Sequence, residues 1–378
     1  RPGVVARHVG GALVVGVDDE TEIFRSVWKF YKRNAAEIAS HVRSTAQQST
    51  TTRTVPQSQS VAESETERPA PRALGPIPCL DFDNLDLSPP SLRALVEPVQ
   101  ICGAQSASED ISVSSAFTIR GRPGFTFLPK PFVNSDIEAF WASKLAIKFA
   151  SGSDAERNTV NGAMTGALDA RLRWSTLGFH YRWKQREYSE EHCSPFPSDL
   201  AKLAIDLAAS VGDNIVPETA IINYYKRKAT MGGHRDDAEW TDEAPVVAIS
   251  FGNAGVYVLG GDGQTDEGPP PPIPVIVRNG DVVLLGGKSR MNLHGVPCML
   301  ENTLPDSFHR ALLRTNIPDL GCGPLRPGGA RSAGGSEAKE RPAALLAQYM
   351  ADTRINVNVR QVRARAAALQ AARRVLRP

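Results

Sequence analysis

The sequence predicts a mainly β domain with flanking helices, in which antiparallel strands form a sandwich or jelly roll. After residue 219, six short runs rich in β-branched residues are broken by Gly, Pro, Asn or Asp: AIINYY, VVAISF, VYVLGG, IPVIV, DVVLLGG and RINVNVR. Their close succession argues against a parallel α/β sheet. With 378 residues, of which 41% are hydrophobic, the chain can form one large domain or two ordinary ones.

The N-terminal part of the chain predicts one amphipathic helix followed by a linker. In EIFRSVWKFYKRN (22–34) the helical period puts four apolar residues on one face, opposite basic residues: Phe24, Val27, Trp28 and Tyr31. Residues 44–76 are rich in Ser, Thr, Gln and Pro, a composition typical of disorder. We therefore expect an N-terminal helical segment over 1–43 and a low-complexity, largely disordered linker over 44–119.

Ordered sequence is expected to resume with GRPGFTFLPKPF (121–132), a turn, a short strand and another turn. A helix should begin at Ser135 as its cap, with one apolar ridge formed by Ile137, Trp141, Leu145 and Phe149. A second helix should start at a Ser198 cap, stop at Gly212 and bury Leu200, Leu203, Ala204, Leu207 and Val211.

These elements and the six strands define an expected domain over 120–362. Within it, 261–272 predicts a hairpin excursion, and the Gly-rich stretch within 321–343 predicts a mobile insertion. The alanine-rich end of the chain, 363–378, predicts a basic C-terminal helix.

Charge and cysteine content exclude several classes. The net charge is only +2, so a nucleic-acid partner would need a local basic patch. Five scattered cysteines without a C-x-x-C pair argue against a disulfide framework or structural zinc site and favour a reducing compartment. No apolar run is long enough to span a membrane. We expect an intracellular monomer; cytoplasm, nucleus and mitochondrion are not distinguished.

A metal site is indicated by the stretch TMGGHRDDAEW (230–240). In an extended segment His234 and Asp236 point to the same side, so both can face one ion. His294 in SRMNLHGVP can supply a third ligand, which completes the two-histidine, one-carboxylate triad of non-haem Fe(II) oxygenases. Asp237 is a rival to Asp236, although the two-residue spacing favours the latter. Taken alone, the stretch fits the solvated polar tip of a hairpin better than a metal site, so support for a metal must come from the rest of the chain.

An anion site is indicated by RINVNVRQV (354–362). Its alternation puts four polar residues on one face of a strand: Arg354, Asn356, Asn358 and Arg360. Guanidinium groups bind carboxylates bidentately, so this face suits a dicarboxylate. The two arginines lie roughly 20 Å apart along the strand, so one of them could instead support a neighbouring group. An ordinary amphipathic surface strand would show the same alternation.

Together these stretches resemble the AlkB-like Fe(II)/2-oxoglutarate dioxygenases, and most closely their AlkB homologue 1 branch. The resemblance is carried by NYY (223–225), HRD (234–236), SFGNAGVYVLGG (250–261), GDVVLLGGKSRMNLHGVP (280–297) and RINVNVRQV, with LRWSTLGFHYRW (172–183) upstream. It implies a double-stranded β-helix with His234, Asp236 and His294 as iron ligands. It also implies that 2-oxoglutarate is surrounded by Asn223, Tyr224, Tyr225, Arg354, Asn356 and Arg360.

The resemblance further implies an enzyme that uses Fe(II), 2-oxoglutarate and O2 to demethylate N-methylated nucleobases, with release of formaldehyde, succinate and CO2. It points first to 1-methyladenine in tRNA and second to DNA. A target base must be single-stranded or flipped out, and expected contacts are Phe179, His180, Tyr181, Trp183 and Arg290. Tyr181 and His180 are preferred; Arg290 could instead order the loop that carries His294. Open alternatives are an oxygenase for protein or small molecules, a non-catalytic nucleic-acid scaffold and a zinc hydrolase.

Overall fold

A computed structural model describes the chain except for residues 1–4, 10–11, 17–18, 52–78, 103–108, 161–166, 262–269, 318–341 and 376–378. Most of the expected hairpin excursion and nearly all of the expected 321–343 insertion lie outside the described residues. No helix within the described part of the chain is long and apolar enough to cross a membrane.

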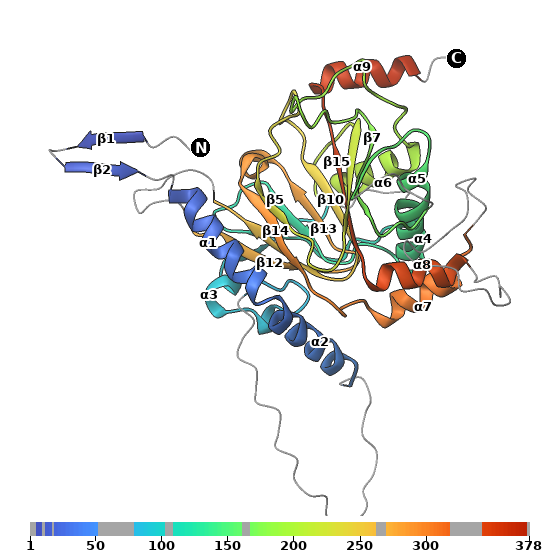
Figure 1. The fold of residues 1–378 in the computed structure, drawn as a ribbon, viewed down its shortest axis with the longest axis horizontal. Coiled ribbons are helices and arrows are strands. Elements are labelled where there is room, and N and C mark those ends of the chain that lie inside the picture. The colour runs from blue at the N-terminus through green and yellow to red at the C-terminus, as the bar shows by residue number, and fades with distance from the viewer. Residues whose placement is uncertain are drawn as a thin grey trace, which may run out of the picture.

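Two antiparallel sheets face each other and form the jelly roll that the sequence predicts (Figure 1). In spatial order the larger sheet contains β3 (Val96–Pro98), β4 (Phe117–Ile119), β5 (Phe125–Leu128), β13 (Val282–Leu285), β10 (Val246–Gly252), β15 (Arg354–Arg360), β8 (Thr219–Tyr225), β7 (Leu172–Gly178) and β6 (Glu156–Thr159). The smaller sheet contains β12 (Ile273–Val277), β11 (Gly255–Leu259), β14 (His294–Met299) and β9 (Met231–His234). All six predicted runs are strands, and the predicted fold class is confirmed.

Helices cover the outer face of the larger sheet (Figure 1). They are α4 (Ser135–Ser143) with its π-helical extension (Lys144–Lys148) and α5 (Phe149–Ser151), α6 (Ser198–Ala209), α7 (Asp306–Arg314) and α8 (Pro342–Ala351). Both predicted caps are wrong. The Asn134 side chain caps α4 by accepting from two backbone amides, and α6 follows Pro197 without a side-chain cap. The chain reverses after α6 at Gly212, whose φ of +81° favours glycine.

The outer face of the smaller sheet is covered by α1 (Asp19–Arg33) and α2 (Ala35–Thr51). Phe24 and Tyr31 are buried there, as the helical period predicts, and Trp28 Nε1 donates to the Met231 carbonyl at 2.9 Å. Phe24 lies directly against Gly233, where an added Cβ would come within 2.7 Å of its ring. Helix α1 therefore supports β9 from behind.

Two further elements lie away from this sandwich core. β1 (Val5–Val9) and β2 (Ala12–Gly16) form a two-stranded sheet, and α9 (Arg365–Val375) lies where the basic C-terminal helix is expected.

The expected linker over 44–119 is too long at both ends. Helix α2 continues to Thr51, and β3 and β4 extend the larger sheet. Leu80 is fully buried and bridges to Val275 of β12. Strands β3 and β4 are short and lie among polar residues. The polar composition of the whole stretch therefore hides the few apolar side chains that anchor them.

Phe24→Ala should lower the free energy of unfolding by about 3–5 kcal/mol, because it leaves a cavity behind β9. Urea denaturation measures this loss, and Phe30→Ala is the control, since Phe30 is 49% exposed on the same helix. Equal effects of the two substitutions would contradict the packing of α1 on the smaller sheet.

Candidate metal and co-substrate site

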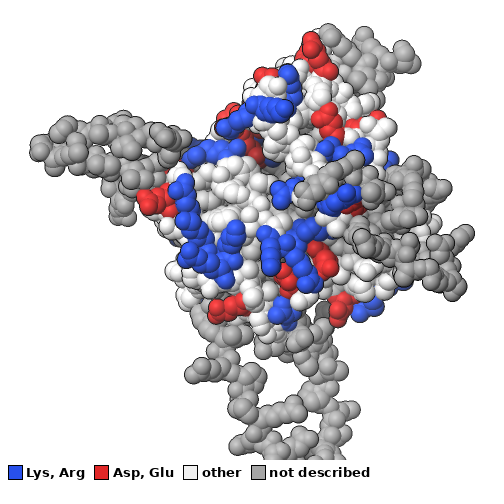
Figure 2. Space-filling model, in the orientation of Figure 1, with Lys and Arg blue, Asp and Glu red and all other residues white. Residues whose placement is uncertain are grey.

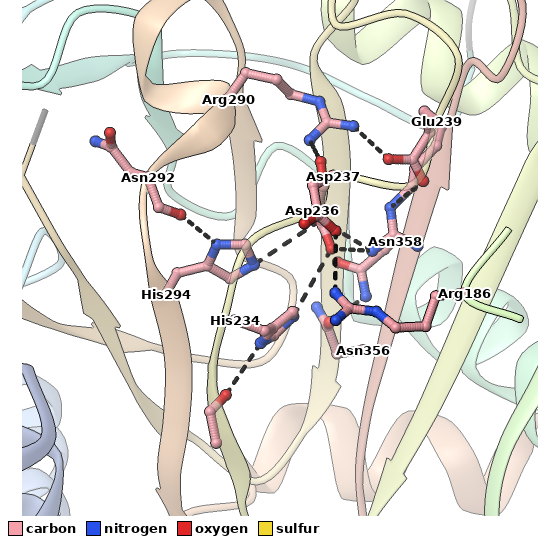
Figure 3. A network of polar contacts seen from close by, with 12 residues as sticks. Arg186, His234, Asp236, Asp237, Glu239, Arg290, Asn292, His294, Asn356 and Asn358 are labelled. Atoms are coloured by element: carbon pink, nitrogen blue, oxygen red, sulfur yellow. Dashed lines mark hydrogen bonds and ion pairs between the residues drawn. The ribbon is translucent and has the colours of Figure 1, made fainter. Parts of the chain in front are cut away.

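Three potential metal ligands converge at the edge of the smaller sheet. His234 ends β9 and is the antiparallel partner of His294, which begins β14, while Asp236 follows two residues after β9. One ligand atom from each residue lies within 4.8 Å of the others. The Asp236 carboxylate oxygens lie 3.7 Å from His234 Nε2 and 3.8 Å from His294 Nε2. Figure 3 shows the three side chains pointing toward one another.

Hydrogen bonds behind the two imidazoles prepare them as ligands. Nδ1 of His234 lies 3.0 Å from the Gly232 carbonyl, and Nδ1 of His294 lies 3.0 Å from the Asn292 carbonyl. Because a carbonyl can only accept, each Nδ1 carries the proton and each Nε2 keeps its lone pair. Burial, reinforced by His234, lowers the pKa of His294 to about 4. His294 is therefore neutral at physiological pH, as metal binding requires.

Asp236 is held ionised by the strand opposite. Arg360 Nη2 donates to both carboxylate oxygens at 2.9 Å. Burial alone would raise the pKa of Asp236, but Arg360 and then the two imidazoles hold it well below its usual range. Arg290, 2% exposed, fixes the same loop by donating to the Asp236 carbonyl at 2.5 Å and to Glu239 at 2.8 Å. The donor set of two imidazoles and one carboxylate fits an Fe(II) ion.

Arg354 lies near the other end of the polar face of β15 and has a different environment. It is 3% exposed, and its guanidinium donates to the Asn253 and Val277 carbonyls and to Ser250 Oγ. Its Nε has no hydrogen-bond partner, and no described carboxylate forms an ion pair with it. Burial lowers its pKa to about 10. A buried cation without a counter-charge is costly, so this position fits the distal carboxylate of 2-oxoglutarate.

One cavity of about 400 Å³ connects the metal-ligand cluster to Arg354. Its lining includes Asn223, Tyr225 and Asn356, three of the residues expected around the co-substrate. Tyr224, expected beside the co-substrate, does not line the cavity. Its hydroxyl contacts Ser175 and the Leu145 carbonyl in the helix-covered core, because adjacent strand residues point to opposite faces.

The expected substrate contacts divide into two groups. Tyr181 and Trp183 line the cavity, with ring centroids 4.8 Å apart, and Trp183 is 45% exposed. Phe179, His180 and Arg290 do not line it. Phe179 packs under Trp240, and buried His180 bonds to Thr176 at 2.8 Å. Their side chains pack against other elements and do not face the cavity, so their expected substrate roles are corrected; Arg290 orders the Asp236 loop.

Sequence reasoning missed several residues of this cavity, among them Ser250, Tyr257 and Glu239. Ser250 and Tyr257 line it from β10 and β11, and Glu239 lines it near Asp236 while contacting Arg290. Strand alternation could have placed Ser250 on the inner face, since Ser250 pairs with Asn356 of β15. Nothing in the sequence indicates Glu239, which lies in a loop.

Comparison with known proteins places this geometry in a family. The 2OG-Fe(II) oxygenase superfamily profile matches residues 131–360, more than half of the chain. "Nucleic acid dioxygenase ALKBH1" of Homo sapiens is 29% identical over 279 residues, which are 67% of this chain and 68% of that protein. "DNA N(6)-methyladenine demethylase ALKBH1A" of Arabidopsis thaliana is 33% identical over 213 residues, 55% of this chain and 54% of that protein.

Two further matches are a yeast relative, which aligns over a shorter stretch, and a solved structure. "tRNA demethylase abh1" of Schizosaccharomyces pombe is 32% identical over 139 residues, 36% of this chain and 45% of that protein. A solved structure, "The structure of OsALKBH1", has a TM-score of 0.42 and 22% identity and covers 64% of this chain and 97% of that chain. The expected likeness to the AlkB homologue 1 branch is confirmed by the curated relatives. The chain therefore belongs to the 2OG-Fe(II) oxygenase superfamily and is a dioxygenase of that family.

Proposed function

We propose that this dioxygenase oxidatively demethylates N-methylated nucleobases in nucleic acid, first 1-methyladenine in tRNA and second methylated DNA. The observation that carries the proposal is the convergence of His234, Asp236 and His294 in one cavity with Arg354, a buried cation that forms no ion pair with any described residue. The catalytic unit comprises residues 120–362, acts as a monomer and is followed by a basic C-terminal helix.

The residues have separate tasks in this reaction. His234, Asp236 and His294 would hold Fe(II), and Arg354 would bind the distal carboxylate of 2-oxoglutarate, with Asn223, Tyr225 and Asn356 beside it. When bound, Fe(II) with 2-oxoglutarate and O2 supplies the oxidation that converts an N-methyl group to formaldehyde and the co-substrate to succinate and CO2. Arg360 supports the iron-binding carboxylate and does not need to reach the co-substrate.

Three features support a nucleic-acid substrate. Relatives named for DNA and tRNA demethylation share up to about a third of their residues with this chain in the matched regions. Tyr181 and Trp183 present aromatic surfaces at the cavity, which suits a flipped or single-stranded base. Figure 2 shows Lys and Arg side chains gathered on one face, and α1 contributes exposed Arg25, Lys29, Lys32 and Arg33.

Mass spectrometry of nucleosides tests the function. The protein is incubated with Fe(II), 2-oxoglutarate and either bulk tRNA, methylated single-stranded DNA or a methylated peptide. We expect loss of 1-methyladenosine from tRNA together with formaldehyde release. Formaldehyde from the peptide alone would refute the nucleic-acid assignment, and loss of methyl groups from DNA alone would refute the tRNA preference.

Tyr181→Ala should raise the KM for methylated nucleic acid by roughly five- to a hundredfold, the effect of losing one base–aromatic stack of about 1–3 kcal/mol. The KM for 2-oxoglutarate should change little, because Tyr181 lies outside the Arg354 end of the cavity. Steady-state kinetics with each substrate varied in turn measures both values. An unchanged nucleic-acid KM would exclude Tyr181 as a base contact.

A further inference from the structure

The aromatic segment, residues 179–188, lies between β7 and α6 and contacts the metal-ligand loop at its far end. An isolated bridge between Arg182 and Glu187 closes the segment on itself. Within it, the rings of Tyr181 and Tyr188 lie 5.3 Å apart, so the cavity-lining Tyr181 rests on a second aromatic residue. A base that displaces Tyr181 would therefore also press on Tyr188.

Tyr188 connects this segment to a buried acid. It is 4% exposed, and its hydroxyl donates to Glu239 Oε1 at 3.1 Å. The segment has one other polar link to the same loop, between Arg186 and Asp237 at 3.5 Å. That pair is exposed on both sides, so water screens it, whereas the Tyr188 hydrogen bond is sheltered.

Glu239 continues the connection to the metal-ligand cluster. Its second oxygen accepts from Arg290 at 2.8 Å, and its first lies 3.6 Å from Arg360 Nε. That Nε has no hydrogen-bond partner, while Arg360 Nη2 binds both oxygens of Asp236. Arg360 thus stands between two carboxylates, and Figure 3 shows Arg290, Glu239 and Asp236 in this network.

We infer that Tyr188 is a positioning residue that couples the aromatic segment to the metal-binding carboxylate through Glu239 and Arg360. The Tyr188 hydroxyl satisfies part of the Glu239 charge, which leaves Arg360 on Asp236. Without that donor, Glu239 competes more strongly for Arg360, and the Asp236 carboxylate loses its fixed orientation. The coupling of Tyr188 to Asp236 is argued from these contacts alone. Movement of the aromatic segment by a bound nucleobase, in contrast, rests on the proposed function.

Coupling between two sites is reciprocal, so metal binding should also steady the aromatic segment. Hydrogen–deuterium exchange of residues 179–188 is measured in the full chain, without nucleic acid, before and after anaerobic addition of Mn(II) and 2-oxoglutarate. We expect these amides to exchange about tenfold more slowly in the loaded wild type, because a hydrogen bond to a charged acceptor resists opening to that degree. Tyr188→Phe keeps the ring and should abolish the slowing.

Two controls test whether the hydroxyl of Tyr188 is responsible. Tyr349→Phe removes the hydroxyl of another buried tyrosine, a group that has no hydrogen-bond partner among the described residues, and should keep the tenfold slowing. Arg186→Ala removes the exposed link from the same segment and should also keep it. Slowing that survives in Tyr188→Phe, or that is lost equally in Arg186→Ala, would overturn the inference.

A second measurement separates this inference from the proposed function. With methylated RNA, the succinate-to-formaldehyde ratio should rise about threefold or more in Tyr188→Phe, since substrate engagement no longer reaches Asp236. An unchanged ratio on a substrate that the wild type demethylates would overturn the coupling. If no nucleic acid is demethylated at all, the proposed function fails, and the exchange experiment still decides whether Tyr188 is coupled to the metal site.

Discussion

Asp236→Ala is expected to reduce turnover to background, a loss larger than the roughly 10- to 100-fold that follows removal of a group merely supporting a metal ligand. The substitution removes the one carboxylate among the three clustered groups and leaves Arg360 facing Glu239 alone. Formaldehyde and succinate release measure turnover, and bound iron measured after anaerobic loading should fall in parallel. His294→Ala should give the same result.

Asp237→Ala is the matched control. Asp237 is adjacent in sequence, but its side chain is 47% exposed and pairs with Arg186. The Asp237→Ala variant should keep turnover within about tenfold of the wild type, because it loses only one exposed ion pair and one contact at the cavity. Activity in Asp236→Ala combined with inactivity in Asp237→Ala would show that the other acid binds the metal.

Anaerobic absorption spectra give a second test of the same site. Addition of 2-oxoglutarate to the Fe(II)-loaded wild type should produce a charge-transfer band, which Asp236→Ala should lack. A wild type that binds zinc and shows no such band with iron would instead favour a hydrolase, and one that binds no metal would favour a non-catalytic scaffold.

Arg354→Met should raise the KM for 2-oxoglutarate at least about thirtyfold, because loss of one partner of a buried, hydrogen-bonded charge pair costs about 2–5 kcal/mol. Turnover at saturating 2-oxoglutarate should fall much less, since Arg354 contacts none of the three clustered metal-ligand side chains. The KM of Arg354→Lys for 2-oxoglutarate should lie between those of the wild type and Arg354→Met, because lysine keeps the charge but lacks the planar pair of donors. Calorimetric titration of Mn(II)-loaded protein measures the affinity directly.

The stability of the same variants provides the control. Arg354 has no ion-pair partner among the described residues, so Arg354→Met removes only hydrogen bonds to neutral groups and should lower the free energy of unfolding of the ligand-free protein by less than Arg360→Met does. Arg360→Met should lower it by about 3–5 kcal/mol, since Asp236 and Glu239 would lose a shared buried cation. An unchanged 2-oxoglutarate affinity in Arg354→Met would place the co-substrate elsewhere.

Local patterns were sufficient for the strands and for much of the site. β-Branched runs broken by Gly, Pro, Asn or Asp identified the six predicted strands. Period-two alternation places His234 with Asp236 and Arg354 with Asn356, because alternate residues share a face. The same rule argues against Tyr224, which lies between the cavity-facing Asn223 and Tyr225. The cap of α4 was missed because Asn134 and Ser135 are adjacent and equally suitable as sequence.

By itself, then, the sequence determined the strand-rich fold class, the helical face of α1 and the residues that can bind a metal and a dicarboxylate. Only the tertiary structure decided what these residues contact: Arg360 donates to Asp236, 124 positions away, whereas Arg354 forms no ion pair with any described residue. It also buried His180 and Arg290 and brought Glu239 to Tyr188. Periodicity fixes which side chains share one strand face, whereas contacts between distant strands and loops depend on how the two sheets close over each other.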